Sequence, residues 1–388
     1  MSLWKIVLKN IAQRKLSSTL TSASIALGVA VVIAVLALRS QARSGFDQSA
    51  FGYDLVVGGK GSALQLVLNT VYHMDQSQGN LSRERYKELA AHKAVTSAIP
   101  LSVGDSYRGA RIIGTTDSFF SAFQFGIDGR PFKEGAFEAV IGSTAAARTG
   151  LRVGDAFQAS HGIEDAGETH EEKWTVVGVM KPTGTPNDRA IFITLDSFYH
   201  IKDHRQTTGI SAVIVKARNP ASALQLQYDL NQLPDAMAAS PAGVMAEFFD
   251  KFDWVPMLLL AVSGLVVVMA AVSIFVAIYN SMSERRRPIA IMRALGARRG
   301  TVLSIVMLEA AVLAAFGGLG GLVLGHLLTA VAGGAISARS GVPISAFAFH
   351  PEELAVVAGV LVLGAVAGIL PALKAYRTDI ADGLSPSS

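Results

Sequence analysis

Histidines are the residues of this 388-residue chain whose type and spacing could hold a metal ion, and four of them lie close together in sequence. His161 and His170 flank an acidic stretch. His200 and His204 stand four residues apart, the spacing at which two imidazoles on a helix can share a metal. The stretch has no fixed ligand pattern, and surface loops are often acidic for solubility alone. We keep His161, His170, His200 and His204 as candidate metal ligands and prefer the interpretation of a solvated loop.

Other chemistry has little support in the sequence. The glycine-rich stretch 58–62 lacks the Gly-Lys-Ser/Thr order of a phosphate-binding loop, and no serine-hydrolase elbow or metalloprotease motif is present. The chain contains no cysteine, which excludes disulfides and cysteine-bound metals. Glu309 and His326 fall inside apolar segments, where we expect them to act as structural hydrogen-bonding groups. We therefore expect no catalysis and no cofactor in this chain, and any chemical energy must come from a partner.

Four apolar segments are long enough to cross a bilayer, whose hydrocarbon core takes about 20 helical residues. They cover residues 17–38, 254–282, 301–334 and 354–373, in a chain that is 51% hydrophobic. Residues 39–253 have the composition of a globular domain and are long enough to bury a core. The sequence predicts a membrane protein with four transmembrane α-helices and a large extracytoplasmic α+β domain between helices 1 and 2.

Lysine and arginine predict the orientation in the membrane. The segments 1–16, 283–300 and 374–388 are basic. In the short loop 335–353, Arg339 is the only lysine or arginine. Basic loops stay in the cytoplasm. We therefore expect both termini inside the cell, and the large domain on the periplasmic side of an inner (plasma) membrane. The net charge of +4 is explained by this topology, so we expect no nucleic-acid partner.

The first sixteen residues carry apolar side chains at helical spacing, with lysines and an arginine between and after them. This pattern is typical of an amphipathic elbow helix that lies on the membrane lipid. The alternative is a basic flank with no defined role.

The outer segment alternates predicted helices and strands. Ser82 is a suitable N-cap for a helix over 82–93, and a second helix is expected over 220–231. Short runs rich in Val and Ile, bounded by turn residues, predict strands. These runs are Val95–Ile99, Ala110–Gly114, Ala139–Ile141, Trp174–Val179, Ala190–Thr194 and Ser211–Lys216. We expect one α+β domain with a small inserted lobe around 101–185.

Glycines recur every four residues in the later apolar segments, at Gly317, Gly321 and Gly325 and again at Gly364 and Gly368. Small residues at this spacing let helix backbones approach closely. We expect these positions to pack helices, either in a bundle or across a dimer. The alternative is that glycine is simply common in membrane helices.

The stretch 284–299 holds six arginines and one acid between two membrane spans. Its apolar residues, Ile289, Ile291, Met292 and Leu295, form a short stripe. This pattern predicts a basic, partly amphipathic helix at the cytoplasmic membrane surface.

These features resemble the permease subunits of MacB/FtsX-type (type VII) ABC transporters, which include lipoprotein-releasing relatives. The resemblance covers the whole architecture and three local motifs: ERRRPIAIMRALGA at 284–297, MLEAAVLAAFGGLGGLVLG at 307–325, and the Pro371-Ala372 tail. Pro288 departs from the family, in which an acid is common, and we expect the helix to start near it. The resemblance implies that the coupling residues are Glu284, Arg285, Arg286, Arg287, Ile289, Ile291, Met292, Arg293, Leu295 and Gly296.

The resemblance also implies a homodimer that works with two copies of a cytoplasmic ATPase, which would bind ATP and Mg. The motion of the ATPase would pass through the membrane spans to the outer domains, a mechanism called mechanotransmission. The expected function is export or extraction of a lipoprotein, lipid, peptide or other hydrophobic envelope substrate, with cargo or a periplasmic adaptor bound outside. One alternative is an FtsX-like regulator that activates a periplasmic enzyme. Another is a receptor or scaffold that does not depend on ATP.

Overall fold

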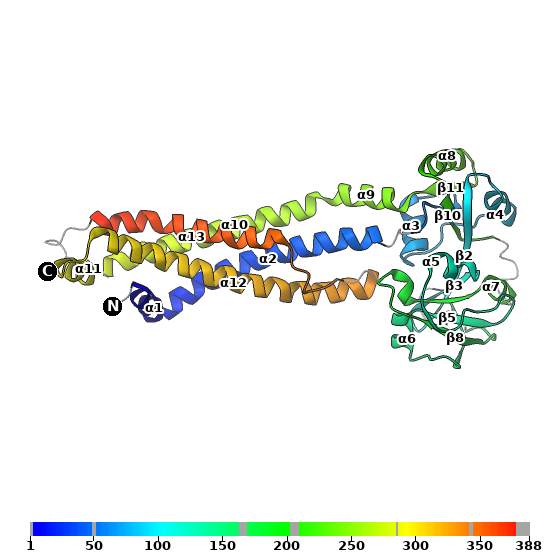
Figure 1. Ribbon diagram of the computed structural model, residues 1–388, viewed down its shortest axis with the longest axis horizontal. Coiled ribbons are helices and arrows are strands. Elements are labelled where there is room, and N and C mark those ends of the chain that lie inside the picture. Colours follow the sequence, from blue (N-terminus) through cyan, green and yellow to red (C-terminus); the bar gives the residue numbers. More distant parts are fainter. Residues whose placement is uncertain are drawn as a thin grey trace. The chain divides into compact units, whose positions relative to one another are not determined.

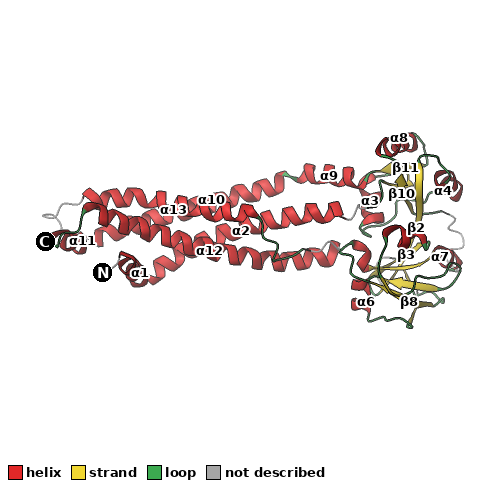
Figure 2. Cartoon of the chain, viewed as in Figure 1, coloured by secondary structure: helices red, strands yellow, loops and turns green. Residues whose placement is uncertain are grey.

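The computed structural model describes residues 3–48, 52–162, 169–201, 209–284, 286–340 and 344–377. The chain divides into two compact units. The helical unit comprises Met1–Gln41, Asp253–Gly334 and Ile344–Ser388, and the mixed domain comprises Ala42–Phe252 and Ala335–Pro343. Figure 1 traces both units along the sequence, and Figure 2 shows that the strands belong to the mixed domain.

The helices of the first unit are long and apolar. They are α1 (Leu3–Gln13), α2 (Lys15–Gln48), α10 (Trp254–Glu284), α11 (Arg286–Ala294), α12 (Arg299–Ser340) and α13 (Pro351–Arg377). In the described residues, four helical stretches are long and apolar enough to cross a membrane: Lys15–Gly45, Pro241–Asn280, Arg299–Ser337 and Pro351–Ile369. Together with the mixed domain, they confirm the predicted fold class. Several of these helices continue beyond the predicted apolar segments into polar sequence.

Small and β-branched residues fill the centre of the helical unit. Its core includes Ile25, Val29, Ile33, Ile274, Val306, Ala310 and Ala314. Larger apolar residues of α10 and α13 face outward, such as Met257, Leu265 and Val362, which are all more than half exposed. An outward apolar surface of this kind suits contact with lipid, which offers no penalty for exposing leucine or valine.

The glycines of α12 pack against α2 within the same chain. An added methyl group at Gly317, Gly321 or Gly325 would come within 2.8 Å of the Cβ atoms of Ile25, Val29 and Ile33 respectively. The α2 backbone is equally close, since such a methyl group at Gly321 would lie 2.8 Å from the carbonyl oxygen of Ala26. Gly364 and Gly368 of α13 meet Ala314 and Ala310 of α12 in the same way. The sequence left open whether these glycines pack helices within a bundle or across a dimer. In the structure they pack helices within a bundle of one chain.

The mixed domain is built on one sheet. Among the described residues it has eleven strands in the order β11-β1-β10-β2-β3-β9-β5-β8-β4, with β6 paired to β8 and β7 to β2. The strands are β1 (Leu55–Gly59), β2 (Val95–Tyr107), β3 (Ala110–Thr115), β4 (Ile127–Gly129), β5 (Glu138–Ile141), β6 (Ala156–Phe157), β7 (Ser160–His161), β8 (Trp174–Met180), β9 (Ala190–Thr194), β10 (Ala212–Ala217) and β11 (Ala236–Ala239). The six predicted strand runs all lie in or overlap strands of this sheet.

The helices of the mixed domain lie between and beside these strands. They are α3 (Ala63–Val71), α4 (Arg83–Ala90), α5 (Ser118–Phe123), α6 (Ser143–Thr149), α7 (Leu195–His200), α8 (Pro220–Asn231) and α9 (Pro241–Phe252), with a 3-10 turn at Pro186–Arg189. Ser82 caps α4 as expected, because its hydroxyl accepts a hydrogen bond from the Arg85 amide at 3.1 Å. Asn219 caps α8 through the Ser222 amide.

The long strand β2 joins the two halves of the sheet. Its first part pairs with β10 and its second part with β3 and β7. The lobe expected around 101–185 is therefore a continuation of the same sheet. This lobe also includes β9, which follows the predicted boundary and pairs with β3 and β5. Its core packs around Trp174, whose indole N–H donates a hydrogen bond to Ser197 at 3.1 Å.

Candidate functional site

Helix α11 lies between two membrane-length helices and has a defined C-terminal end. Its described residues are Arg286–Ala294, and Pro288 lies in the first turn of this range, where its missing N–H costs no hydrogen bond. Gly296 follows the helix with φ of +100°. The amide of Gly296 donates to the Arg293 carbonyl and that of Ala297 to the Met292 carbonyl, both at 3.0 Å. This is a Schellman ending, which requires a glycine-compatible backbone, so Gly296 fixes where the helix stops.

The apolar stripe of α11 separates into two faces. Ile289 is 5% exposed and belongs to the core of the helical unit, and Met292 packs against the same core. Ile291 and Leu295 point away and are 45% and 83% exposed. Helical periodicity turns Ile289 and Met292 toward the bundle, so the four residues of the stripe do not share one exposed face. Only Ile291 and Leu295 remain as an apolar surface, which we call the α11 outer face.

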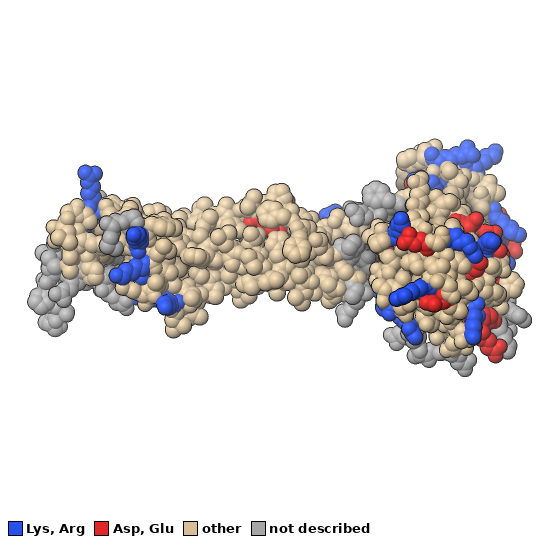
Figure 3. Space-filling model, turned by 60° about the horizontal axis from the view of Figure 1, so that its bottom comes forward, with Lys and Arg blue, Asp and Glu red and all other residues tan. Residues whose placement is uncertain are grey.

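Basic residues surround this face. Arg293 lies on α11 and is partly buried, and Arg298 and Arg299 follow its end. Basic side chains gather at the end of the helical unit that carries α1 and α11, whereas most of the visible surface between its ends carries no charge (Figure 3). Arg285 lies outside the described residues, as do the side chains of Glu284, Arg286 and Arg287.

Helix α1 has the amphipathic character expected of an elbow. Val7 is fully buried against Ile305 and Val312 of α12. Trp4 and Leu8 are 51% and 41% exposed, as residues inserted into a membrane interface would be. The helix is thereby attached to α12 by one face and presents apolar side chains on another.

His326 connects α12 to the start of α13. Its Nδ1 lies 2.7 Å from the carbonyl oxygen of Ala346, and its Nε2 lies 3.0 Å from Oε2 of the fully buried Glu353. Oε1 of Glu353 also accepts the amide of His350, the residue before α13, at 3.2 Å. These contacts connect the His326 imidazole both to the segment before α13 and to the first turn of that helix.

Few polar side chains are buried in the described part of the helical unit. They are Thr21, Ser263, Glu309, Thr329 and Glu353. Glu309, the other predicted intramembrane polar residue, is 5% exposed within α12. These residues come from α2, α10, α12 and α13.

The candidate metal ligands separate in the mixed domain. His161 and His170 come together, with Asp105 of β2 between them. His200 lies on α7, where its Nδ1 is 2.7 Å from the carbonyl oxygen of Asp196. His204 lies outside the described residues. Of the two histidine pairs, His161 and His170 both lie in the described residues, and the structure brings them together.

Two sequence stretches with no assigned role, 54–73 and 182–193, meet in this domain. Nε2 of His73 lies 2.8 Å from Oδ1 of Asn187. Burial lowers the pKa of His73 to about 4, although the hydrogen bond with Asn187 acts in the opposite direction. A cavity of about 380 Å³ adjoins this contact and is lined by Tyr53, Phe123, Lys181 and Asn187 among others.

Comparison with known proteins places these elements in one family. Residues 18–233 match the model of the MacB-like periplasmic core domain, and residues 260–380 match the model of the FtsX-like permease C-terminal region. The chain belongs to the MacB/FtsX-type permeases of ABC transporters. Helices α11, α12 and α13 fall in the second match, and strands β1 to β10 fall in the first.

Individual relatives agree with this assignment. The permease is 24% identical, over 95% of its length, to the macrolide export ATP-binding/permease protein MacB of Bdellovibrio bacteriovorus, of which it spans only 59%. It is 23% identical to the uncharacterized ABC transporter permease YknZ of Bacillus subtilis, with 98% of each chain covered. It is 26% identical to the lipoprotein-releasing system transmembrane protein LolC of Neisseria meningitidis serogroup B, with 79% of this permease and 75% of LolC covered.

Two polar residues of this permease escaped sequence reasoning. Glu353 stands in the first turn of α13, where an acid is favoured by the helix dipole, and that position was the only available signal. Asp105 stands in a run of small and polar residues far from His161 in sequence, and only strand pairing brings the two together.

Proposed function

We propose that this permease is the membrane subunit of a mechanically coupled ABC transporter and that α11 receives a separate ATPase. The α11 outer face carries the proposal: Ile291 and Leu295 are exposed beside basic residues, while Ile289 on the same helix is buried in the bundle. A helix with one face free for a partner and another fixed in a core can pass a displacement from one to the other.

The orientation follows from charge. The basic segments around α1 and α11 are proposed to lie in the cytoplasm, with both chain ends, and the membrane to be the inner (plasma) membrane. The mixed domain then lies on the extracytoplasmic side. Trp4 and Leu8 of α1 would rest in the lipid interface on the cytoplasmic side.

Transmission would depend on the packing of α12 against α2. Gly317, Gly321 and Gly325 bring the two helices close along several turns, and a close-packed contact resists compression. Because Ile289 shares a core with Val302 and Val306 of α12, a push on α11 acts on this helix pair. The pair would then move largely as one body and carry the motion toward the mixed domain.

The proposed assembly is a homodimer of this permease with two copies of the ATPase, which holds ATP and Mg. The exposed apolar surfaces of α10 and α13 are available to lipid and to the second copy. The relatives named for macrolide export and lipoprotein release suggest a cargo class: a lipoprotein, lipid, peptide or other hydrophobic envelope compound. Few polar side chains are buried in the described part of the helical unit, which favours handling of cargo, or of an adaptor, by the mixed domain.

The test replaces Ile291 and Leu295 with aspartate and measures ATP hydrolysis. The ATPase is the one that co-purifies with the wild-type permease from native membranes, and both are reconstituted in lipid nanodiscs. Each apolar side chain buried at an interface contributes about 1.5–3 kcal/mol, so the double variant should lose permease-dependent ATP hydrolysis by more than about tenfold.

The matched control is Leu224→Asp on α8 of the mixed domain, since Leu224 is 69% exposed and lies far from α11 in sequence. It should leave hydrolysis unchanged. Recovery of no ATPase with the wild-type permease, or unchanged hydrolysis in the Ile291→Asp/Leu295→Asp variant, would contradict the proposal.

A further inference from the structure

Strand pairing in the mixed domain sets an aspartate opposite a histidine. β7 pairs with the end of β2 in antiparallel register, with Asp105 opposite His161 and Ser106 opposite Ser160. The Gly162 amide donates to the Gly104 carbonyl at 2.9 Å and extends this pairing. Residues directly opposite one another on antiparallel strands direct their side chains to the same face. The Asp105 carboxylate and the His161 imidazole are therefore held together by the backbone.

A third residue reaches the same point from the next segment. Thr169 forms an isolated bridge with Ser160, and the His170 amide donates to the Ala159 carbonyl at 2.8 Å. The side chain of Gln158 donates to the His170 carbonyl at 3.0 Å. These bonds fix the backbone of His170 beside β7, and its side chain turns inward, with the residue only 4% exposed.

The three side chains converge on a single oxygen. Oδ1 of Asp105 lies 3.4 Å from Nδ1 of His161 and 3.2 Å from Nε2 of His170. One ligand atom from each residue lies within 4.8 Å of the others. The two imidazole rings are 5.8 Å apart and nearly perpendicular, at 88°.

The two separations from Oδ1 of Asp105 match those in a tetrahedral metal site. Ligand atoms about 2.1 Å from a zinc ion at tetrahedral angles stand about 3.4 Å apart. Imidazole nitrogen and carboxylate oxygen are also the ligand types that zinc accepts. We propose that Asp105, His161 and His170 form a site for a divalent transition-metal ion of the zinc class.

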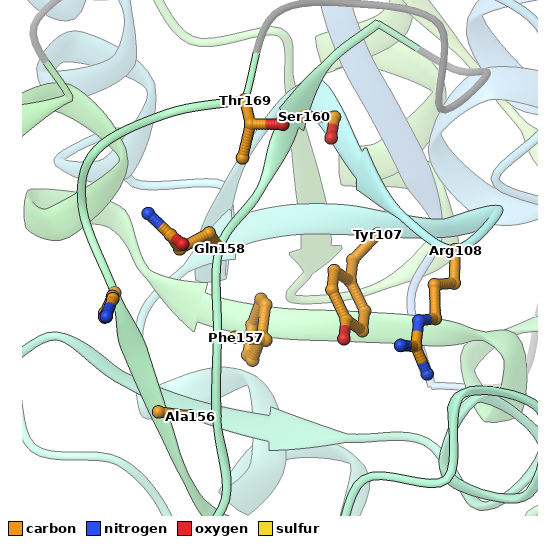
Figure 4. Close-up of a pocket in the computed structure, with 8 residues that line it drawn as sticks. Tyr107, Arg108, Ala156, Phe157, Gln158, Ser160 and Thr169 are labelled. Carbon is orange, nitrogen blue, oxygen red and sulfur yellow. The ribbon is translucent and has the colours of Figure 1, made fainter.

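The burial of the residues predicts how the site is used. Asp105 and His170 are almost fully buried, whereas the His161 side chain is 59% exposed, so an ion would enter from the His161 side. Three protein ligands leave a fourth position for water. A cavity of about 490 Å³ lies in the same lobe, and its lining includes Ser160 and Thr169, the residues immediately before the two histidines (Figure 4).

A bound ion would join segments that are otherwise connected mainly by short strands. β7 contains two residues, and the bridge at Thr169 is isolated. The ion would hold both to β2 and so stabilise this lobe in proportion to metal concentration, because a ligand that binds only the folded state favours that state. This role is independent of ATP coupling at α11.

The test is zinc binding by the untagged full-length permease in detergent, measured by competition with a chromogenic chelator. Zn²⁺ alone is the probe, and the expected stoichiometry is one ion per chain. Loss of even a supporting residue around a metal weakens binding by about 10–100-fold, so His161→Ala, which removes a ligand, should weaken it by at least about 100-fold. Because the His161 side chain is exposed, His161→Ala should fold as the wild type does. The His200→Ala control should bind zinc as the wild type does.

A cysteine variant gives a readout independent of affinity. The chain contains no cysteine, so His161→Cys introduces a single thiol, and cysteine is itself a zinc-class ligand. With Co²⁺ this variant should show thiolate-to-metal charge-transfer absorption that the wild type lacks. Absence of stoichiometric zinc binding in the wild type would overturn the proposal. So would binding that His161→Ala leaves intact, or a His161→Cys variant that holds Co²⁺ without the absorption.

Discussion

Large and small residues have opposite positions in the helical unit and in the mixed domain. In the helical unit, glycines and alanines occupy the closest contacts, and leucines such as Leu265 point outward. In the mixed domain, Trp174, Phe192 and other large side chains fill the interior. Burial from water drives the second arrangement, whereas close contact between backbones drives the first, because lipid is as apolar as the helix surface.

This difference means that the two regions are sensitive to different changes. A helix contact built on glycine leaves no room for one additional methyl group, whereas a core of large side chains is sensitive mainly to lost volume and to buried charge. Two substitutions test the comparison, one in each region.

The larger effect is expected for Gly321→Ala in the helical unit. The new methyl group would lie 2.5 Å from Cβ of Val29 and 2.8 Å from the Ala26 carbonyl oxygen, which cannot rotate away. Overpacking of this kind costs about 1–3 kcal/mol, and we expect the upper end of that range. Thermal unfolding in detergent measures the loss.

The neighbouring Gly320→Ala is the matched control, since its methyl group would lie 3.6 Å from Ala26 Cβ, an ordinary contact. It should leave stability within about 0.5 kcal/mol of wild type. Val29→Gly removes the Val29 Cβ atom, so it should cost less stability in the Gly321→Ala background than in the wild type; strictly additive losses would disprove the helix contact.

A smaller effect is expected from protonation of His73 in the mixed domain. The unfolded chain binds a proton at this residue near pH 6.5, but the folded domain does so only near pH 4. Between these values the unfolded state holds more protons, so stability is complete above pH 6.5 and falls as the pH drops toward 4. Since His73 keeps part of its surface exposed, we expect a loss of about 1–2 kcal/mol between pH 7 and pH 5.

His73→Asn removes the titrating group and suits the left-handed backbone at this position, where φ is +53°. Unfolding of the variant and the wild type, followed at a series of pH values, should show a weaker dependence in the variant. Identical pH dependence in the two proteins would mean that His73 is not the group responsible.

The elements of the fold were largely predictable, because each carries a local signal. Long apolar runs identified the membrane helices, and α8 has the bounds of the predicted helix 220–231, since Asn219 and Pro220 mark its start. α3 was not predicted, because its residues Ala63–Val71 resemble an apolar strand as much as a helix. The order of strands in the sheet also could not be predicted, because it depends on pairing between distant segments.

The candidate sites were predictable only in part, for the same physical reason. The sequence indicated that the glycines pack helices, because this depends on spacing within one helix. The sequence did not show which face of α11 turns toward the core, because this depends on the packing of α11 against α12. Asp105 joined the two histidines only through the register of β2 and β7.

The central claim is that α11 passes the work of an ATPase to the mixed domain, and a distance measurement tests it most directly. In this cysteine-free chain, Leu224→Cys gives one spin-label position on the exposed surface of α8. Double electron–electron resonance then reports the distance between the labels of a dimer reconstituted with the ATPase. A non-hydrolysable ATP analogue should shift this distance in the wild-type background, and the shift should vanish when Leu295→Asp is added. A distance that does not respond to nucleotide, or a shift that survives Leu295→Asp, would contradict the account.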